Sequence, residues 1–168
     1  MPIPVIWGGE VCEQIAATIV ARGLAQSPPI IMESINMSSY KRCVLASFAE
    51  CSQTAVVLVQ TIENNEPPEA AGGFIRFFKK KTHSAIMLAD KLTYSVLAIG
   101  DSNLLLDRQT TAAKDCNAVG QALDARLQEL GATCFYERGE VDERTGMEEL
   151  EPWMESLWPA LATLSKIE

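Results

Sequence analysis

The stretch that decides the fold runs from Val5 to Gly23 and reads "VIWGGEVCEQIAATIVARG". Its first residues form an uninterrupted apolar run, which is typical of a buried strand. Apolar residues then recur four positions apart, at Ile15 and Ile19, as they do on one face of a helix. A glycine pair separates the two patterns. A strand, a tight turn and a helix are the first half of a β-α-β unit, so the stretch predicts a parallel sheet.

The glycine turn in this stretch is the first candidate for a functional site. Amides in the first turn of a helix lack intrahelical acceptors, and the helix dipole favours negative charge there, so such turns often bind phosphate. Here the turn carries Glu10 and Glu13. Either the turn still binds a phosphate, or one of these carboxylates lies against the helix amides as a cap, and we expect the second.

The rest of the chain alternates between apolar strand patterns and amphipathic helix patterns. This alternation predicts one domain over residues 1–168, an α/β doubly wound, flavodoxin-like fold with five parallel strands in the order 2-1-3-4-5 and helices on both faces. The clearest central strand is "TAVVLVQT" (54–61), which has no charged residue. The other expected strands are 4–8, 28–34, 94–100 and 133–139, and the expected helices are 9–23, 38–50, 66–81, 113–131 and 147–167.

Composition narrows the range of functions. The chain of 168 residues is 48% hydrophobic, which is enough to form a core, and has a formal net charge of -8. The negative charge argues against nucleic acid and favours a protein partner with a basic surface. Five cysteines without a C-x-x-C pair indicate core thiols in a reducing compartment. No apolar run is long enough to span a membrane, so we expect a cytoplasmic protein. The sequence does not determine its oligomeric state.

Three loops follow the strands that should lie at the centre of the sheet, and ligands of this fold class bind there. No zinc-ligand spacing, Ser-His-Asp signature or G-x-G-x-x-G motif is present. A phosphoacceptor receiver would need an aspartate at the end of the third strand, where Gln60 and Thr61 stand instead. The residues alone therefore indicate where the site lies and leave its chemistry open.

A family resemblance adds chemistry. The stretch "LDARLQELGATCFYERGEVDERTGMEELEPWMESLWPAL" (Leu123–Leu161), with "AIGDS" and "CNAVGQALD" before it, resembles the FMN-binding domain of diflavin reductases, the family of NADPH-haemoprotein reductase and methionine synthase reductase. The resemblance implies an electron-transfer flavoprotein domain that passes electrons from an NADPH- and FAD-dependent module to an acceptor protein. We expect that 168 residues are too few to contain that module, so the chain should not oxidise NADPH on its own.

The resemblance also assigns cofactor-binding positions in the three loops. They are Gly8, Gly9 and Glu10 in the first loop, Thr61 and Asn64 in the second, and Gly100, Asp101 and Ser102 in the third.

All three loops depart from the family pattern. The first lacks every hydroxyl of the family's Ser-x-Thr-Gly-Thr-Ala-Glu, and each lost contact to a phosphate is worth about 1.5–3 kcal/mol. In the second, Glu63 and Asn65 replace two glycines, and positive φ is easier for asparagine than for glutamate. The third keeps Gly-Asp-Ser, has leucines where the family has an aromatic ring, and is longer than usual, with sixteen residues between Gly100 and Asn117. We therefore expect FMN binding to be weakened or lost.

An acidic segment follows the expected fifth strand. The resemblance implies that its carboxylates dock a redox partner, and the alternative is a merely solvated segment. The candidate docking residues, expected to be exposed near the carboxyl edge of the sheet, are Glu140, Asp142, Glu143, Glu148 and Glu149. Two functions remain open: an electron-transfer domain of the diflavin-reductase type, or a flavodoxin-like interaction or regulatory protein without flavin.

Overall fold

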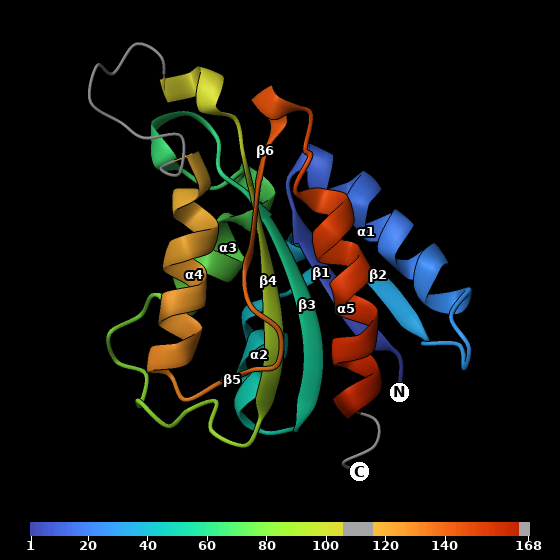
Figure 1. Cartoon of the computed structure of the whole chain (residues 1–168). Coiled ribbons are helices and arrows are strands. Elements are labelled where there is room, and N and C mark those ends of the chain that lie inside the picture. The colour runs from blue at the N-terminus through green and yellow to red at the C-terminus, as the bar shows by residue number, and fades with distance from the viewer. Residues whose placement is uncertain (106–115, 165–168) are drawn as a thin grey trace.

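A computed structural model of the chain describes residues 1–105 and 116–164. Its parallel sheet has the strand order β2-β1-β3-β4-β5, with β6 also paired to β4. The order predicted from the sequence is confirmed, and Figure 1 shows the helices on both faces. The strands are β1 (Ile3–Gly8), β2 (Met32–Asn36), β3 (Gln53–Gln60), β4 (Leu92–Gly100), β5 (Thr133–Cys134) and β6 (Gly139–Asp142). The α-helices are α1 (Glu10–Leu24), α2 (Arg42–Ala46), α3 (Glu69–Phe78), α4 (Ala118–Glu129) and α5 (Leu150–Leu164).

Strand β3 lies at the centre, between β1 and β4, as its uncharged apolar sequence predicts. Successive side chains of a strand point to opposite faces, so β3 contributes to two cores. Val57 and Val59 pack with residues of α2, α3 and α4, and Val56 and Leu58 pack with residues of α1 and α5. Figure 1 shows the same division, with α1 and α5 together on one face of the sheet.

Several element boundaries differ from those predicted. Strand β2 begins at Met32, four residues later than expected, and the second helical region is a short α2 followed by the 3-10 helix η2 (Ser47–Ala49). Helix α3 begins at Glu69, directly after Pro68, because the fixed φ of proline suits the start of a helix. The expected start of the fourth long helix, residues 113–115, and the expected end of the last, residues 165–167, lie outside the described residues. No helix in the described ranges combines the length and the apolar character that a membrane span requires.

The fifth strand differs most from the prediction, because it consists of two short segments. In β5, Thr133 pairs with Thr93, whereas in β6 Gly139 pairs with Leu97, so the chain between the segments has two residues more than β4 has opposite it. Tertiary contacts explain the break. The Glu137 carbonyl accepts a hydrogen bond from the Trp153 indole of α5 at 3.2 Å rather than from a neighbouring strand.

Candidate functional site at the carboxyl ends of the strands

The three loops predicted from the sequence meet at one edge of the sheet, because parallel strands all end on the same side. The first is the turn from Gly8 to Cys12 after β1. The second follows β3 and contains the 3-10 helix η3 (Glu63–Asn65). The third follows β4 and contains the 3-10 helix η4 (Ser102–Leu105). A fourth segment, the 3-10 helix η6 (Glu143–Thr145) after β6, reaches the same edge. The sequence did not place this segment among the cofactor loops.

The first turn is tightly packed. Gly9 is the N-cap of α1 and has a φ of 133°. Residues other than glycine rarely adopt this backbone conformation. A Cβ atom at Gly9 would lie 2.6 Å from Cβ and Oε1 of Gln60, and a Cβ at Gly8 would lie 2.6 Å from the Ala71 methyl group and the Met37 sulfur. Both glycines are therefore required by packing, whatever the turn binds.

The expected carboxylate cap is not present in the described first turn. Gly9 has no side chain to cap the helix, and Glu10 and Glu13 are exposed residues of that turn without a hydrogen bond to its amides. Their charges still lie at the positive end of the helix dipole. The reason for the wrong prediction is that an acceptor side chain reaches the first amides best from the N-cap position, and these glutamates follow it.

The cysteines are only partly the core thiols that the sequence predicted. Cys12 and Cys116 are buried, whereas Cys51 and Cys134 are exposed free thiols. Burial is the main reason why the pKa of Cys12 rises to about 12, and the charge of Glu143 raises it further, while backbone hydrogen bonds at Gly8 and Cys12 itself lower it. Cys12 is therefore a neutral thiol beneath the first turn at ordinary pH.

The second loop uses asparagine where the family uses glycine. Asn64 and Asn65 both have a φ of 59°, so the left-handed conformation falls on asparagines, as the sequence predicted for Asn65, and Glu63 avoids it. The predicted cofactor residue Thr61 is buried, and its hydroxyl oxygen accepts a hydrogen bond from the Val119 amide at 3.0 Å. This contact ties the loop to the start of α4.

The Gly-Asp-Ser residues of the third loop, Gly100, Asp101 and Ser102, contact their own loop and its neighbours. Gly100 is packed so closely that a Cβ atom would lie 2.0 Å from the Cys116 carbonyl oxygen. The Asp101 carboxylate accepts a hydrogen bond from the Asn103 amide at 2.9 Å. The Ser102 amide donates to Oδ1 of Asp142 at 3.0 Å. Residues 106–115, which make up most of the extra length of this loop, lie outside the described residues.

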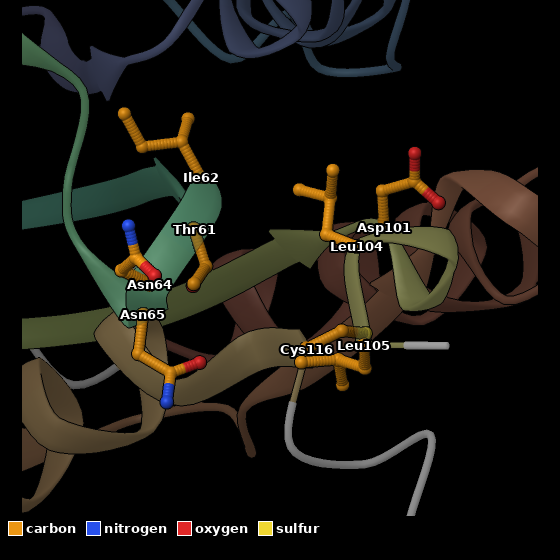
Figure 2. A pocket seen from close by; sticks show the side chains of 8 residues that line it. All are labelled: Thr61, Ile62, Asn64, Asn65, Asp101, Leu104, Leu105 and Cys116. Atoms are coloured by element: carbon orange, nitrogen blue, oxygen red, sulfur yellow. The ribbon is translucent and has the colours of Figure 1, made fainter. Parts of the chain in front are cut away.

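A small pocket separates the second and third loops, as Figure 2 shows. It is lined by Thr61, Ile62, Asn64, Asn65, Asp101, Leu104, Leu105 and Cys116. Its cavity volume of about 10 Å³ has room for about one water molecule. Ile62 and Leu104 are 40% and 43% exposed, so a flat ligand here would lie against aliphatic side chains. No aromatic residue is among those that line the pocket in the described chain.

The acidic segment is not uniformly exposed, which corrects the sequence prediction. Asp142 is buried, and its Oδ1 accepts hydrogen bonds from the amides of Ser102 and Arg144, each at 3.0 Å. Burial raises the pKa of Asp142, but these hydrogen bonds and the Arg144 charge outweigh it, so that the pKa is lowered. Asp142 therefore holds two loops together and cannot contact a partner directly.

Of the other predicted docking residues, two are exposed and two form contacts within the protein. Glu148 and Glu149 are exposed. Glu140 is half-buried and forms a 2.9 Å ion pair with Arg138, which also pairs with the buried Asp124 of α4. Glu143 is half-buried, and its Oε1 accepts a hydrogen bond from Nε2 of Gln60 at 2.9 Å.

Sequence reasoning missed the pair formed by Gln60 and Glu143. The two residues are 83 positions apart, and no local pattern singles out either of them as the partner of the other. The pKa of Glu143 is raised, mainly by burial and further by the charges of Asp101 and Asp142. The hydrogen bond from Gln60 lowers it, but by less.

These residues do not match a phosphate cradle. The Gln60 side chain lies on the side of Gly9 where a Cβ atom would be, and it is hydrogen-bonded to the Glu143 carboxylate. A phosphate next to Glu143 would meet negative charge where hydroxyl donors would be needed.

Comparison with known proteins identifies the family. The family model described as Flavodoxin matches residues 13–156, so the chain belongs to the flavodoxin family. A flavodoxin from Pseudomonas aeruginosa, solved as a cysteine-to-alanine mutant, superposes with a TM-score of 0.66 at 16% identity over 96% of this chain and 99% of that one. This likeness establishes the fold alone.

Relatives found by sequence comparison narrow the family further than the structural match does. Methionine synthase reductase of Bos taurus is 40% identical over 107 residues, which are 63% of this chain and 14% of the relative. NADPH-dependent diflavin oxidoreductase 1 of Arabidopsis thaliana is 31% identical over 119 residues, which are 69% of this chain and 18% of the relative. The resemblance to flavodoxin-like domains of diflavin reductases is confirmed. The chain matches less than a fifth of the length of these relatives.

Proposed function

We propose that this chain is an electron-transfer domain of the diflavin-reductase type in which FMN binding is weakened or lost. The observation that carries the second half of this proposal is the first turn, where the Gln60 side chain and not a set of hydroxyl donors adjoins Gly9. Family membership and the names of the relatives support the first half.

The relatives are described as reductases and as NADPH-dependent, and most of their length lies outside the matched region. In our proposal, an NADPH- and FAD-dependent module of the kind expected in such proteins supplies the electrons. This chain would stand between that module and an acceptor protein. Its own contribution would be the surface that both proteins recognise.

That surface would use negative charge. Glu148 and Glu149 are exposed near the carboxyl edge of the sheet, and the formal net charge of the chain is -8. A partner with a basic surface would be attracted over a distance and oriented on contact, which mainly accelerates association.

The alternative is an interaction or regulatory protein without flavin. The pocket between the second and third loops favours it, because its exposed lining contains the aliphatic side chains of Ile62 and Leu104 and no aromatic residue among those that the structure describes. An aromatic ring stacked on a flavin adds about 0.5–1.5 kcal/mol beyond area burial, and it tunes the electronics of the cofactor.

Titration with FMN tests the proposal. The purified protein should be colourless, and flavin fluorescence should show no saturable quenching at micromolar FMN, because the loss of two charge-assisted contacts weakens binding by a factor of about a hundred or more. Saturable binding near millimolar FMN would support the electron-transfer lineage with weakened binding. No binding at that concentration would favour the alternative, and a yellow preparation with stoichiometric FMN would refute the proposed weakening.

A further inference from the structure

We propose that Glu143, held by Gln60, keeps a negative charge close to the first turn and so makes the site discriminate against phosphorylated ligands. The inference rests on the proposed function, because it assumes that this edge of the sheet is the ligand site. It assigns a specificity-determining pair of residues that acts against ligands with a phosphate group.

Gln60 is placed between the turn and the carboxylate. It is the last residue of β3, and its Oε1 lies 2.6 Å from the position that a Cβ atom of Gly9 would occupy. From the other side of the same amide group, Nε2 donates a hydrogen bond to Oε1 of Glu143 at 2.9 Å. One amide group therefore lies between the Cβ side of Gly9 and the Glu143 carboxylate, so an anion on that side of the turn would meet Gln60 first and the carboxylate behind it.

Glu143 is held in position by the segment that carries it. Asp142, directly before it, accepts hydrogen bonds from the amides of Ser102 and Arg144, and the Thr145 hydroxyl donates to the Asp142 carbonyl oxygen at 3.1 Å. The bond from Ser102 fixes the turn 142–145 to the third loop, and the other two stabilise the turn itself. Glu143 thus differs from Glu10, which is exposed in the first turn of α1.

The charges around Glu143 add to its effect on an anion. Asp142 from its own segment and Asp101 from the third loop are both acidic and raise the pKa of Glu143. In α1, burial is the main reason why the pKa of Cys12 is raised, and the charge of Glu143 raises it further. Arg144 is the basic residue of the turn, and its guanidinium lies 3.5 Å from the Ser102 hydroxyl. A phosphate dianion would therefore enter a site that already contains several carboxylates.

The experiment compares FMN with riboflavin, which lacks the phosphate, and adds inorganic phosphate as a third probe. The variants are Glu143→Gln, which removes the charge and keeps the shape, Gln60→Ala, which opens the space beside Gly9, and the double variant. Glu149→Gln is the matched control, because it removes the same charge at an exposed position. Dissociation constants come from flavin fluorescence, and phosphate binding comes from the shift in melting temperature against a chloride control of equal ionic strength.

We expect wild type and Glu149→Gln to bind FMN no more than about threefold more tightly than riboflavin, and phosphate should not stabilise either. In the double variant the preference for FMN should rise by about tenfold or more, and phosphate should raise the melting temperature. Glu143→Gln alone should show part of the change, and because it conserves shape it covers the case in which the double variant does not fold.

The outcomes separate the inference from the proposed function. Flavin binding with an unchanged preference in all variants overturns the inference and leaves the electron-transfer proposal standing. Stabilisation by phosphate in the double variant without any flavin binding supports the inference and counts against the electron-transfer proposal. A wild-type protein that prefers FMN strongly, or a set of variants in which no probe binds, overturns the inference.

Discussion

The first turn and the third loop lie at the same edge of the sheet, where they follow β1 and β4 on either side of β3, and two successive carboxylates differ in what they contact there. Asp142 reaches the third loop, where backbone amides donate to it and its pKa falls. Glu143 accepts a hydrogen bond from the side chain of Gln60, the last residue of β3, and burial together with neighbouring acids raises its pKa. The surroundings of each carboxylate therefore decide its charge balance. Asp142 has enough hydrogen-bond donors to favour its charged form, whereas Glu143 does not.

The two regions also differ in how far they keep the family's sequence motifs. The third loop keeps the Gly-Asp-Ser of the family, and in this structure those residues bond to their own loop and to Asp142. The first turn lacks the family's hydroxyls, and the Gln60 side chain lies next to its Gly9. Packing within the scaffold therefore accounts for the retained motif of the third loop, as it does for Gly8 and Gly9 of the first turn.

The largest effect should come from Gly100→Ala in the third loop. The new Cβ atom would lie 2.0 Å from the Cys116 carbonyl oxygen, which is backbone and cannot turn aside. We expect the free energy of unfolding to fall by about 2–4 kcal/mol, measured by urea denaturation. Gly73→Ala is the control, because no atom lies within 4 Å of its Cβ position, and it should raise stability by about 0.5–1 kcal/mol in helix α3. Equal effects of the two variants would contradict the packing described here.

Asp142→Ala should cost less than Gly100→Ala, about 1–3 kcal/mol at pH 7, because the buried Ser102 amide and the partly buried Arg144 amide lose their acceptor. The folded-state pKa of Asp142 lies below its ordinary value of 3.8. Its stabilisation is therefore present above that value and is lost as the pH falls through the lowered pKa. Denaturation curves at pH 7 and at acidic pH should show the gap between wild type and variant narrowing, and a gap independent of pH would show that the carboxylate charge is unimportant.

Glu143→Gln should change stability in the opposite direction and by less. The folded-state pKa of Glu143 is raised above 4.5, so its favourable contribution is present below 4.5 and is lost as the pH rises through the raised pKa. At pH 7 the charged side chain is a burden, and we expect the variant to be more stable by about 0.5 kcal/mol, with no gain at pH 4. Destabilisation at pH 7 like that of Asp142→Ala would erase the contrast between the two carboxylates.

The smallest effect on stability should come from Glu149→Lys, which we expect to lie within about 0.5 kcal/mol of wild type because the side chain is exposed. Association with a basic model partner such as cytochrome c should slow at low salt and change little at high salt. Glu50→Lys makes the same charge change before β3, at the opposite edge of the sheet. If both variants slow association equally, net charge and not a docking surface is responsible.

The sequence by itself determined the fold and the neighbourhood of the site. Runs such as "TAVVLVQT" and the four-residue spacing of Ile15 and Ile19 are local signals, and the central strand, the strand order and the three loops at the carboxyl edge follow from them. The left-handed conformation of Asn65 was predictable for the same reason, because the preference belongs to the residue type.

Only the tertiary structure decided which side chains pair with one another in and around those loops. The fifth strand is split because the Glu137 carbonyl bonds to Trp153 of α5, Asp142 is buried because the third loop offers it an amide, and Gln60 meets Glu143 across 83 residues of sequence. Hydrogen bonds between distant segments leave no periodic trace in the chain. They form because a buried polar group without a partner costs free energy, and which partner is in reach depends on the completed sheet.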